Sequence, residues 1–132
     1  MNLAQINPAW PNSLRWFLVQ NSVNFCPWFF LSEPNEFESV AKVFEDEDLK
    51  NRKVFVFASR QDNDDFAGLE VVNGTILDKV LVFHPTFTTN QSIRDWGIVD
   101  SEFSDVFEFI SKRVVEDMRD WALTEDASEL TE

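Results

Sequence analysis

The sequence contains no tyrosine, one cysteine, one histidine and only three glycines among its 132 residues. A single cysteine, Cys26, cannot form a disulfide within the chain, so a fold held together by disulfides is excluded. Cys26 lies in an apolar run, and we expect a buried, reduced thiol. The glycines Gly68, Gly74 and Gly97 are far apart in the sequence, which excludes a glycine-rich loop of the kind that binds phosphates.

Basic residues are also scarce, with 11 Lys and Arg against 24 Asp and Glu and a formal net charge of −13. Nucleic acids and anionic membranes bind basic surfaces, so direct binding to either is disfavoured and a basic partner is favoured. No apolar run approaches the roughly 20 residues of a membrane span. The N-terminal stretch lacks the basic start, apolar run and cleavage site of a secretory signal, so we expect a cytoplasmic protein.

What the chain does contain is apolar and aromatic material for a core. Hydrophobic residues make up 44% of the sequence and include 14 Phe and five Trp. The length suits one domain with a sizeable core and is too short for two. We therefore expect a single domain over residues 1–132, with the acidic segment 124–132 frayed.

The clearest local pattern lies between Val54 and Phe83. Asn73-Gly74 is the strongest short hairpin signal, because a type I′ turn requires positive φ at both central residues. The stretch Val54–Ala58 is apolar on both faces, as is typical of a central strand. The sequence therefore predicts an antiparallel meander. Its strands are Val54–Ala58, Phe66–Val72 and Thr75–Phe83, with a polar loop at Ser59–Asp65.

Three other stretches repeat apolar residues every three or four positions, the spacing of one helix face. The second follows Ser32, a typical N-cap residue, and has Pro34 in its expected first turn. The third is the longest, and we expect its apolar face to pack on the sheet. That face comprises Phe103, Val106, Phe107, Ile110, Val114, Met118 and Trp121. The predicted helices are Ser13–Gln20, a helix from Ser32 to about residues 45–48, and Ser104–Leu123.

Two segments are less regular. Asn24–Leu31 is apolar enough for a strand, but Pro27 lacks an N–H group, so this strand should lie at a sheet edge or contain a bulge. Thr86–Gly97 fits either a loop or an extra edge strand, anchored by apolar residues. These anchors are Phe87, Ile93 and Trp96. Together the elements predict an α+β fold, with a mainly antiparallel sheet packed by about three helices.

Candidate catalytic and metal-binding residues are few. The Asp62–Asp65 loop offers carboxylates for a divalent cation, but its spacing lacks the glycine and closing glutamate of a calcium loop, so a turn of good turn-forming residues is favoured. The sequence indicates no nucleophile or acid partner for His84, and Ser59 lacks the glycines of a nucleophile elbow. We therefore predict no catalytic residues, metal ligands or cofactor, and no enzyme. A small hydrolase or metal-dependent enzyme at the aspartate loop ranks last.

The order of these elements resembles a known family. The strand VFVFAS, the stretch RQDNDDFAGLEV and the Asn-Gly hairpin returning as ILDKVLVF resemble the SUKH superfamily, the Smi/Knr-like fold best known from bacterial immunity proteins. NFCPWFFLSEPNEF upstream and SEFSDVFEFISKRV downstream are similar to its apolar strand and its closing helix. The resemblance spans Asn24 to Trp121, and Thr86–Gly97 departs from it. It implies an α+β domain with one antiparallel sheet backed by helices, and a non-enzymatic role in binding and neutralising a cognate toxin.

Two functions therefore compete. The first is an immunity protein for a polymorphic or contact-dependent toxin, of which a nuclease is one type. The alternative is an acidic protein-interaction or scaffold module with a housekeeping partner. A toxin that acts on nucleic acid needs basic surface, so two acidic clusters, expected to be exposed, are the candidate contacts. The alternative interpretation is that these residues only keep the surface solvated, as charge runs commonly do. The candidates are Glu45, Asp46, Glu47, Asp48, Asp62, Asp64 and Asp65.

Overall fold

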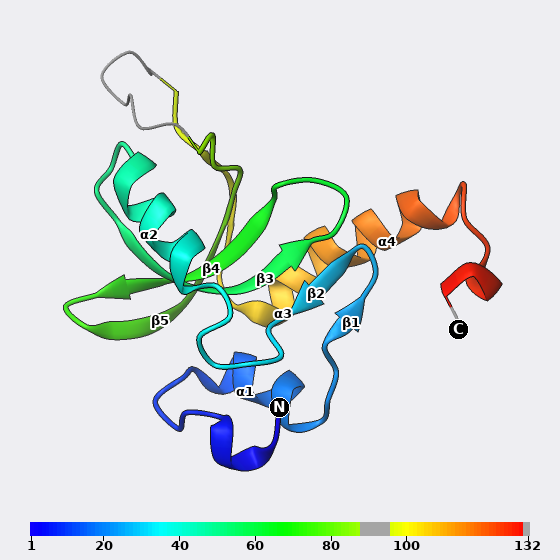
Figure 1. Cartoon of the computed structure of the whole chain (residues 1–132), viewed down its shortest axis with the longest axis horizontal. Helices are drawn as coiled ribbons and strands as arrows, with labels where there is room; N and C mark the ends of the chain where they lie inside the picture. Colours follow the sequence, from blue (N-terminus) through cyan, green and yellow to red (C-terminus); the bar gives the residue numbers. More distant parts are fainter. Residues whose placement is uncertain (88–95, 131–132) are drawn as a thin grey trace.

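The computed structural model describes residues 1–87 and 96–130, and in this part of the chain one antiparallel sheet contains six strands (Figure 1). The strands lie side by side in the order β1-β2-β3-β4-β5-β6, so each pairs with its neighbour in sequence. The strands are β1 (Asn24–Phe25), β2 (Trp28–Phe30), β3 (Lys53–Arg60), β4 (Phe66–Val72), β5 (Thr75–Phe83) and β6 (Val99–Phe103).

Helices cover both faces of this sheet. Alternate residues of β5 belong to different core clusters, because successive side chains of a strand point to opposite faces. Val80 and Val82 pack with residues of α1 and α3, whereas Leu81 and Phe83 pack with Phe44 of α2. The α+β prediction is confirmed. The helices are α1 (Asn12–Val19), α2 (Glu38–Glu47), α3 (Val106–Phe109) and α4 (Val115–Ala122). Shorter helical segments are η1 (Leu3–Gln5), the π-helical η3 (Ile110–Val114) and η4 (Ala127–Leu130).

The predicted hairpin between β4 and β5 is confirmed. Asn73 and Gly74 have φ values of 51° and 78°, and the flanking residues Val72 and Thr75 pair directly across the turn. Positive φ at both positions is the requirement that made Asn-Gly the expected pair. In β4, Gly68 has a different role, because a Cβ atom there would lie 2.9 Å from the Cβ of Val54 on β3. The two strands pack closely at this point.

The segment Asn24–Leu31 is not one strand but a hairpin of two short strands. β1 and β2 flank Cys26-Pro27, which occupies the turn, where the missing N–H of proline breaks no ladder. Cys26 is partly exposed at this turn, so the expected burial of its thiol is wrong. β1 lies at the margin of the sheet, as expected for a strand near proline.

The first two predicted helices differ from the structure only at their starts. α1 lies within one residue of its predicted bounds. α2 begins at Glu38, later than expected, because Ser32 is held in the preceding turn instead of capping the helix. The backbone N–H and hydroxyl of Ser32 both donate to Glu36 Oε1, at 2.6 and 3.0 Å.

The predicted helix Ser104–Leu123 is preceded by a strand, β6, that the pattern analysis missed. Asp105 is the N-cap, and its side chain accepts a hydrogen bond from the Glu108 N–H at 2.9 Å. The apolar stripe is wrong at three positions: Phe103 lies in β6, and Phe107 and Met118 are 45% and 37% exposed. Neighbouring helix positions are about 100° apart, so the sheet-facing side admits Phe109 instead, which is fully buried.

The apolar side chains near both ends of the segment Thr86–Gly97 are exposed. Phe87 and Trp96 are exposed, so their expected anchoring role is wrong, and Ile93 lies outside the described residues. The choice between loop and edge strand also falls largely outside the described residues. At the C-terminus, the expected frayed segment 124–132 contains the helical turn η4. Among the described helices, none is long and apolar enough to cross a membrane.

Candidate functional site

The seven acidic residues predicted as partner contacts divide into two groups. Four are exposed, as expected: Glu45, Asp46, Asp62 and Asp64. The other three are buried, so the expectation of exposure is wrong for them. Glu47, Asp48 and Asp65 have 2%, 5% and 8% of their surfaces exposed. A buried carboxylate needs hydrogen bonds or a cation. Glu47 and Asp65 receive these from distant parts of the chain, and Asp48 receives them from nearby Arg52.

Glu47 joins the end of α2 to the segment after β5. Its Oε1 accepts hydrogen bonds from the backbone N–H of Thr86 at 2.7 Å and from the Thr86 hydroxyl at 2.8 Å. These two residues are 39 positions apart in the sequence. The carboxylate therefore fixes where the chain goes after leaving the sheet.

Asp48 binds Arg52 through both carboxylate oxygens. Oδ2 accepts from the backbone N–H of Arg52 at 2.8 Å and from its Nε at 2.9 Å, and Oδ1 accepts from Nη2 at 3.0 Å. Burial alone would raise the pKa of Asp48, but the hydrogen bonds and charge of Arg52 outweigh it and lower this pKa. Arg52 also lies 3.6 Å from Glu102, which pairs with Lys79 at 2.7 Å, so the ion pair extends across β6 and β5.

Asp48→Asn is expected to lower the free energy of unfolding at pH 7 by about 1–2 kcal/mol, because the amide cannot replace the charged acceptor of Arg52. A carboxylate whose pKa is lowered by folding stabilises the protein above its unfolded pKa of about 4, and this contribution is lost as the pH falls through the folded pKa. The stability difference between wild type and variant should therefore shrink below about pH 4.

Chemical denaturation at several pH values measures this difference. Asp46→Asn, at an exposed neighbouring position, is the matched control and should change stability little at any pH. A difference between wild type and Asp48→Asn that stays constant down to pH 2 would contradict the prediction.

Asp65 joins the β3–β4 loop to β5 and to the C-terminal helical region. Its Oδ1 lies 2.9 Å from His84 Nδ1, and its Oδ2 accepts from Arg113 Nη2 at 3.2 Å. The loop itself closes through a hydrogen bond from the Arg60 N–H to the Asp65 carbonyl at 2.9 Å and one from the Asp65 N–H to Asn63 Oδ1 at 2.8 Å. Three segments that are remote in sequence therefore meet at one buried carboxylate.

Asp117, one helical turn after Arg113, is the second centre of this charge network. Its Oδ2 accepts from Trp28 Nε1 at 2.8 Å and Arg113 Nε at 3.0 Å, and lies 3.2 Å from Arg60 Nη1. Arg60 also donates to both oxygens of Asp62, at 2.6 and 3.1 Å. Burial would lower the pKa of Arg113, but Asp117, Asp100 and Asp65 outweigh it and raise this pKa. The two guanidinium groups are shared among several aspartates.

The network pairs its carboxylates with guanidinium groups, and one of them also with a histidine. His84 and Asp65 form the orienting pair that a catalytic histidine requires. Within the described residues, however, no hydroxyl or thiol donates a hydrogen bond to His84. No three His, Cys, Asp or Glu side chains of the described part converge as a metal site. Asp62 and Asp65, the residues considered as cation ligands, are instead hydrogen-bonded to guanidinium groups.

The segment 84–86, after β5, lies between the β3–β4 loop and the end of α2, which carry the two acidic clusters (Figure 1). Asp65 contacts His84, and two residues later Thr86 contacts Glu47, so the segment 84–86 joins the β3–β4 loop to the end of α2. The exposed members of both clusters lie beside these buried anchors. Among the described residues, Asp46 and Asp64 have no cation within ion-pair distance. The end of the sheet therefore presents carboxylates that the fold does not use.

The pattern analysis missed three residues at the centre of the network: Trp28, Arg60 and Arg113. One signal was present, since Arg113 and Asp117 have the i, i+4 spacing of a helical ion pair. The long-range partners of both residues left no such signal. No protein-family model matches the chain, and no match was found among curated proteins or solved structures.

Proposed function

We propose that this chain is an immunity protein of the SUKH (Smi/Knr-like) type, which binds a basic toxin and neutralises it without being an enzyme. The observation that carries the proposal is that the segment 84–86 links the two acidic clusters through Asp65 and Glu47. Burial of Glu47, Asp48 and Asp65 holds the backbone of both clusters in place, which leaves their exposed neighbours preorganised. Preorganised charge lowers the entropic cost of binding a partner of opposite charge.

Electrostatic steering is the mechanism that this arrangement supports. The chain carries a net charge of −13, and a basic toxin would be attracted from a distance before contact. Such attraction raises association rates more than it raises affinity, and salt suppresses it. The Debye length falls from about 10 Å at 0.1 M salt to about 3 Å at 1 M salt, so association should slow over this range.

The test uses the product of the reading frame adjacent to this one, expressed alone and with this chain. Two variants neutralise one exposed pair each, Glu45→Gln with Asp46→Asn and Asp62→Asn with Asp64→Asn. We expect each to slow association with the toxin about tenfold at low salt and to weaken protection of cells, with little change in thermal stability. The matched control is Glu33→Gln with Glu38→Gln, which removes two exposed acids at the opposite end of α2.

Three results would count against the proposal. If all three variants slow association equally, only net charge matters and the sheet end is not the interface. If both cluster variants bind and protect like wild type, the contact lies elsewhere. If the neighbouring product is not toxic and the chain instead binds a housekeeping protein, the chain is an acidic interaction module.

A further inference from the structure

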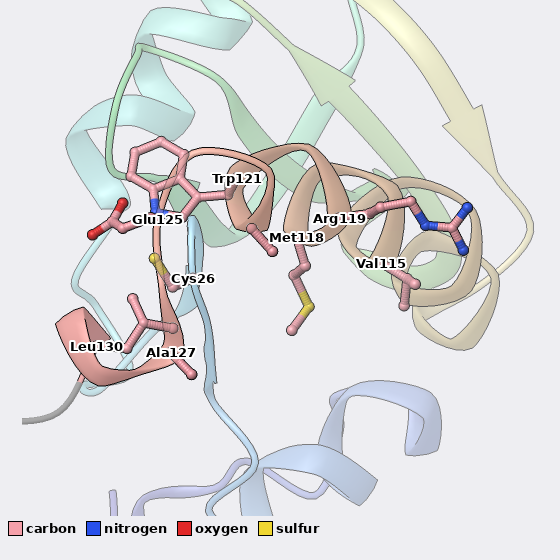
Figure 2. A pocket seen from close by; sticks show the side chains of 9 residues that line it. Cys26, Val115, Met118, Arg119, Trp121, Glu125, Ala127 and Leu130 are labelled. Carbon is pink, nitrogen blue, oxygen red and sulfur yellow. The ribbon is translucent and has the colours of Figure 1, made fainter.

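The C-terminal helical region forms an apolar cleft that the fold leaves open. Beyond the sheet, the chain turns after α4 and returns as η4 toward the β1–β2 turn (Figure 1). The space between them is a cleft of about 390 Å³, within the size range of ligand-binding pockets. Figure 2 shows the side chains around it. Those that are apolar or weakly polar are Cys26, Val115, Met118, Trp121, Ala122, Ala127 and Leu130.

Two features of the lining indicate that the cleft is incomplete without a partner. Met118 is 37% exposed and Leu130 is 55% exposed, although both are large apolar side chains beside a concave surface. The indole Nε1–H of Trp121 is buried and has no hydrogen-bond partner within the described residues. An unpaired buried donor is unfavourable in the free protein, so an acceptor on a bound molecule would be favoured there.

Carboxylates surround this apolar cleft. Glu125 lies in its lining, and a second cleft of about 560 Å³, which shares Cys26, Met118, Glu125 and Leu130, adds Glu129. Arg119 is the single basic residue in the two linings. Partial burial raises the pKa of the Cys26 thiol, and the charges of Glu125 and Asp62 raise it further.

Asp62 also connects the cleft to the acidic sheet end. Gln61, the preceding residue, lines the second cleft and lies 3.8 Å from the Cys26 sulfur. The apolar cleft, its acidic surroundings and the proposed toxin interface are therefore continuous. Aromatic or aliphatic anchors in a pocket, surrounded by polar contacts, are the usual arrangement at a strong protein interface.

We propose that the cleft between α4 and η4 binds a basic polypeptide segment, which inserts one large apolar side chain beside Met118 and Trp121 and places lysines or arginines near Glu125, Glu129 and Asp62. This inference rests on the proposed function, because the toxin is the partner expected to carry the segment. A second copy of this chain is a poor occupant, since each copy carries a charge of −13.

The experiment titrates the isotopically labelled full chain with three tryptophan-free synthetic peptides. One is an amphipathic peptide of leucine and lysine, the second replaces lysine with glutamate, and the third replaces leucine with serine. Only the first combines both required features, so it should bind at least about tenfold more tightly than the other two. It should also shift the indole N–H signal of Trp121, which the variant Trp121→Phe identifies by its loss.

Met118→Asp should weaken binding of the leucine–lysine peptide by at least about tenfold, because it places a charge in the cleft. Leu77→Asp is the matched control: Leu77 is 38% exposed on β5, and its replacement should leave binding unchanged. Three outcomes would overturn the inference. In the first, the serine–lysine peptide binds equally well, which indicates that charge alone drives binding. In the second, the leucine–glutamate peptide binds equally well, which indicates a purely apolar site. In the third, the chain dimerises and Met118→Asp abolishes the dimer.

Met118→Asp, the acidic-cluster variants and the leucine–lysine peptide together separate this inference from the proposed function. If Met118→Asp protects cells as well as wild type while the acidic-cluster variants fail, the toxin does not use the cleft and the inference is overturned, but the proposed function stands. If the leucine–lysine peptide binds the cleft as described but the neighbouring product is not toxic, the proposed function fails and the cleft remains a site for basic segments.

Discussion

Replacing Phe109 with alanine is expected to lower the free energy of unfolding by about 3–5 kcal/mol, the range for removing a fully buried aromatic side chain. Phe109 has no exposed surface and lies where α3 meets the sheet. Its ring packs edge-to-face against Trp28 and Phe57, with centroid distances of 5.2 and 5.7 Å. The neighbours are large and rigid, so the cavity should collapse only partly. Denaturant unfolding measures the loss.

Phe107→Ala is the matched control, because it removes the same atoms two positions away. Phe107 is 45% exposed, and its ring centroid lies 5.1 Å from that of Phe17. We therefore expect Phe107→Ala to lower the free energy of unfolding by only about 1 kcal/mol. A loss at Phe107 as large as that at Phe109 would mean that the other apolar stripe faces the sheet.

Replacing Asp117 with alanine is expected to destabilise the protein by about 2–3 kcal/mol, somewhat less than the loss of a fully buried ion pair because the arginines keep some contact with water. The variant leaves Trp28 Nε1–H without its acceptor and removes a shared anion from Arg60 and Arg113. Trp28 itself is fully buried, so water cannot replace the lost bond without entering the core.

Asp120→Ala is the comparison, since Asp120 is exposed on the same helix and should change stability by less than about 0.5 kcal/mol. Double replacement of Asp117 and Trp28, by alanine and phenylalanine, tests the pairing. If the hydrogen bond matters, the two effects should not add. Additive effects, or a loss at Asp117 no larger than at Asp120, would show that the network contributes little to stability.

Elements specified by local chemistry were predictable from the sequence. The Asn73-Gly74 turn needs only its own two φ values, and α1 needs only its apolar spacing. β6 was not predictable in this way. Asp100 and Ser104 suggest a helix cap, but Asp100 lies within β6, which exists because it pairs with β5. Strand formation of this kind depends on the neighbouring strand more than on intrinsic propensity.

The candidate site shows the same division between local and distant causes. A run of acids such as 45–48 suggests exposed surface, and this holds for Glu45 and Asp46. Glu47 is buried because Thr86, 39 residues away, supplies two donors to its carboxylate. Asp65 is buried because His84 and Arg113 lie beside it. No pattern within either cluster encodes those partners, so burial of these carboxylates could not be inferred.

The two margins of the sheet bear on aggregation. An exposed strand edge is a template on which another chain can add a strand, and long apolar edges promote fibrils. β1, at one margin, has only two residues, so it offers few free backbone groups. β6, at the other, alternates its exposed acids Asp100 and Glu102 with partly buried residues. A second chain pairing there through its own β6 would bring like charges together, so both margins resist edge-to-edge growth.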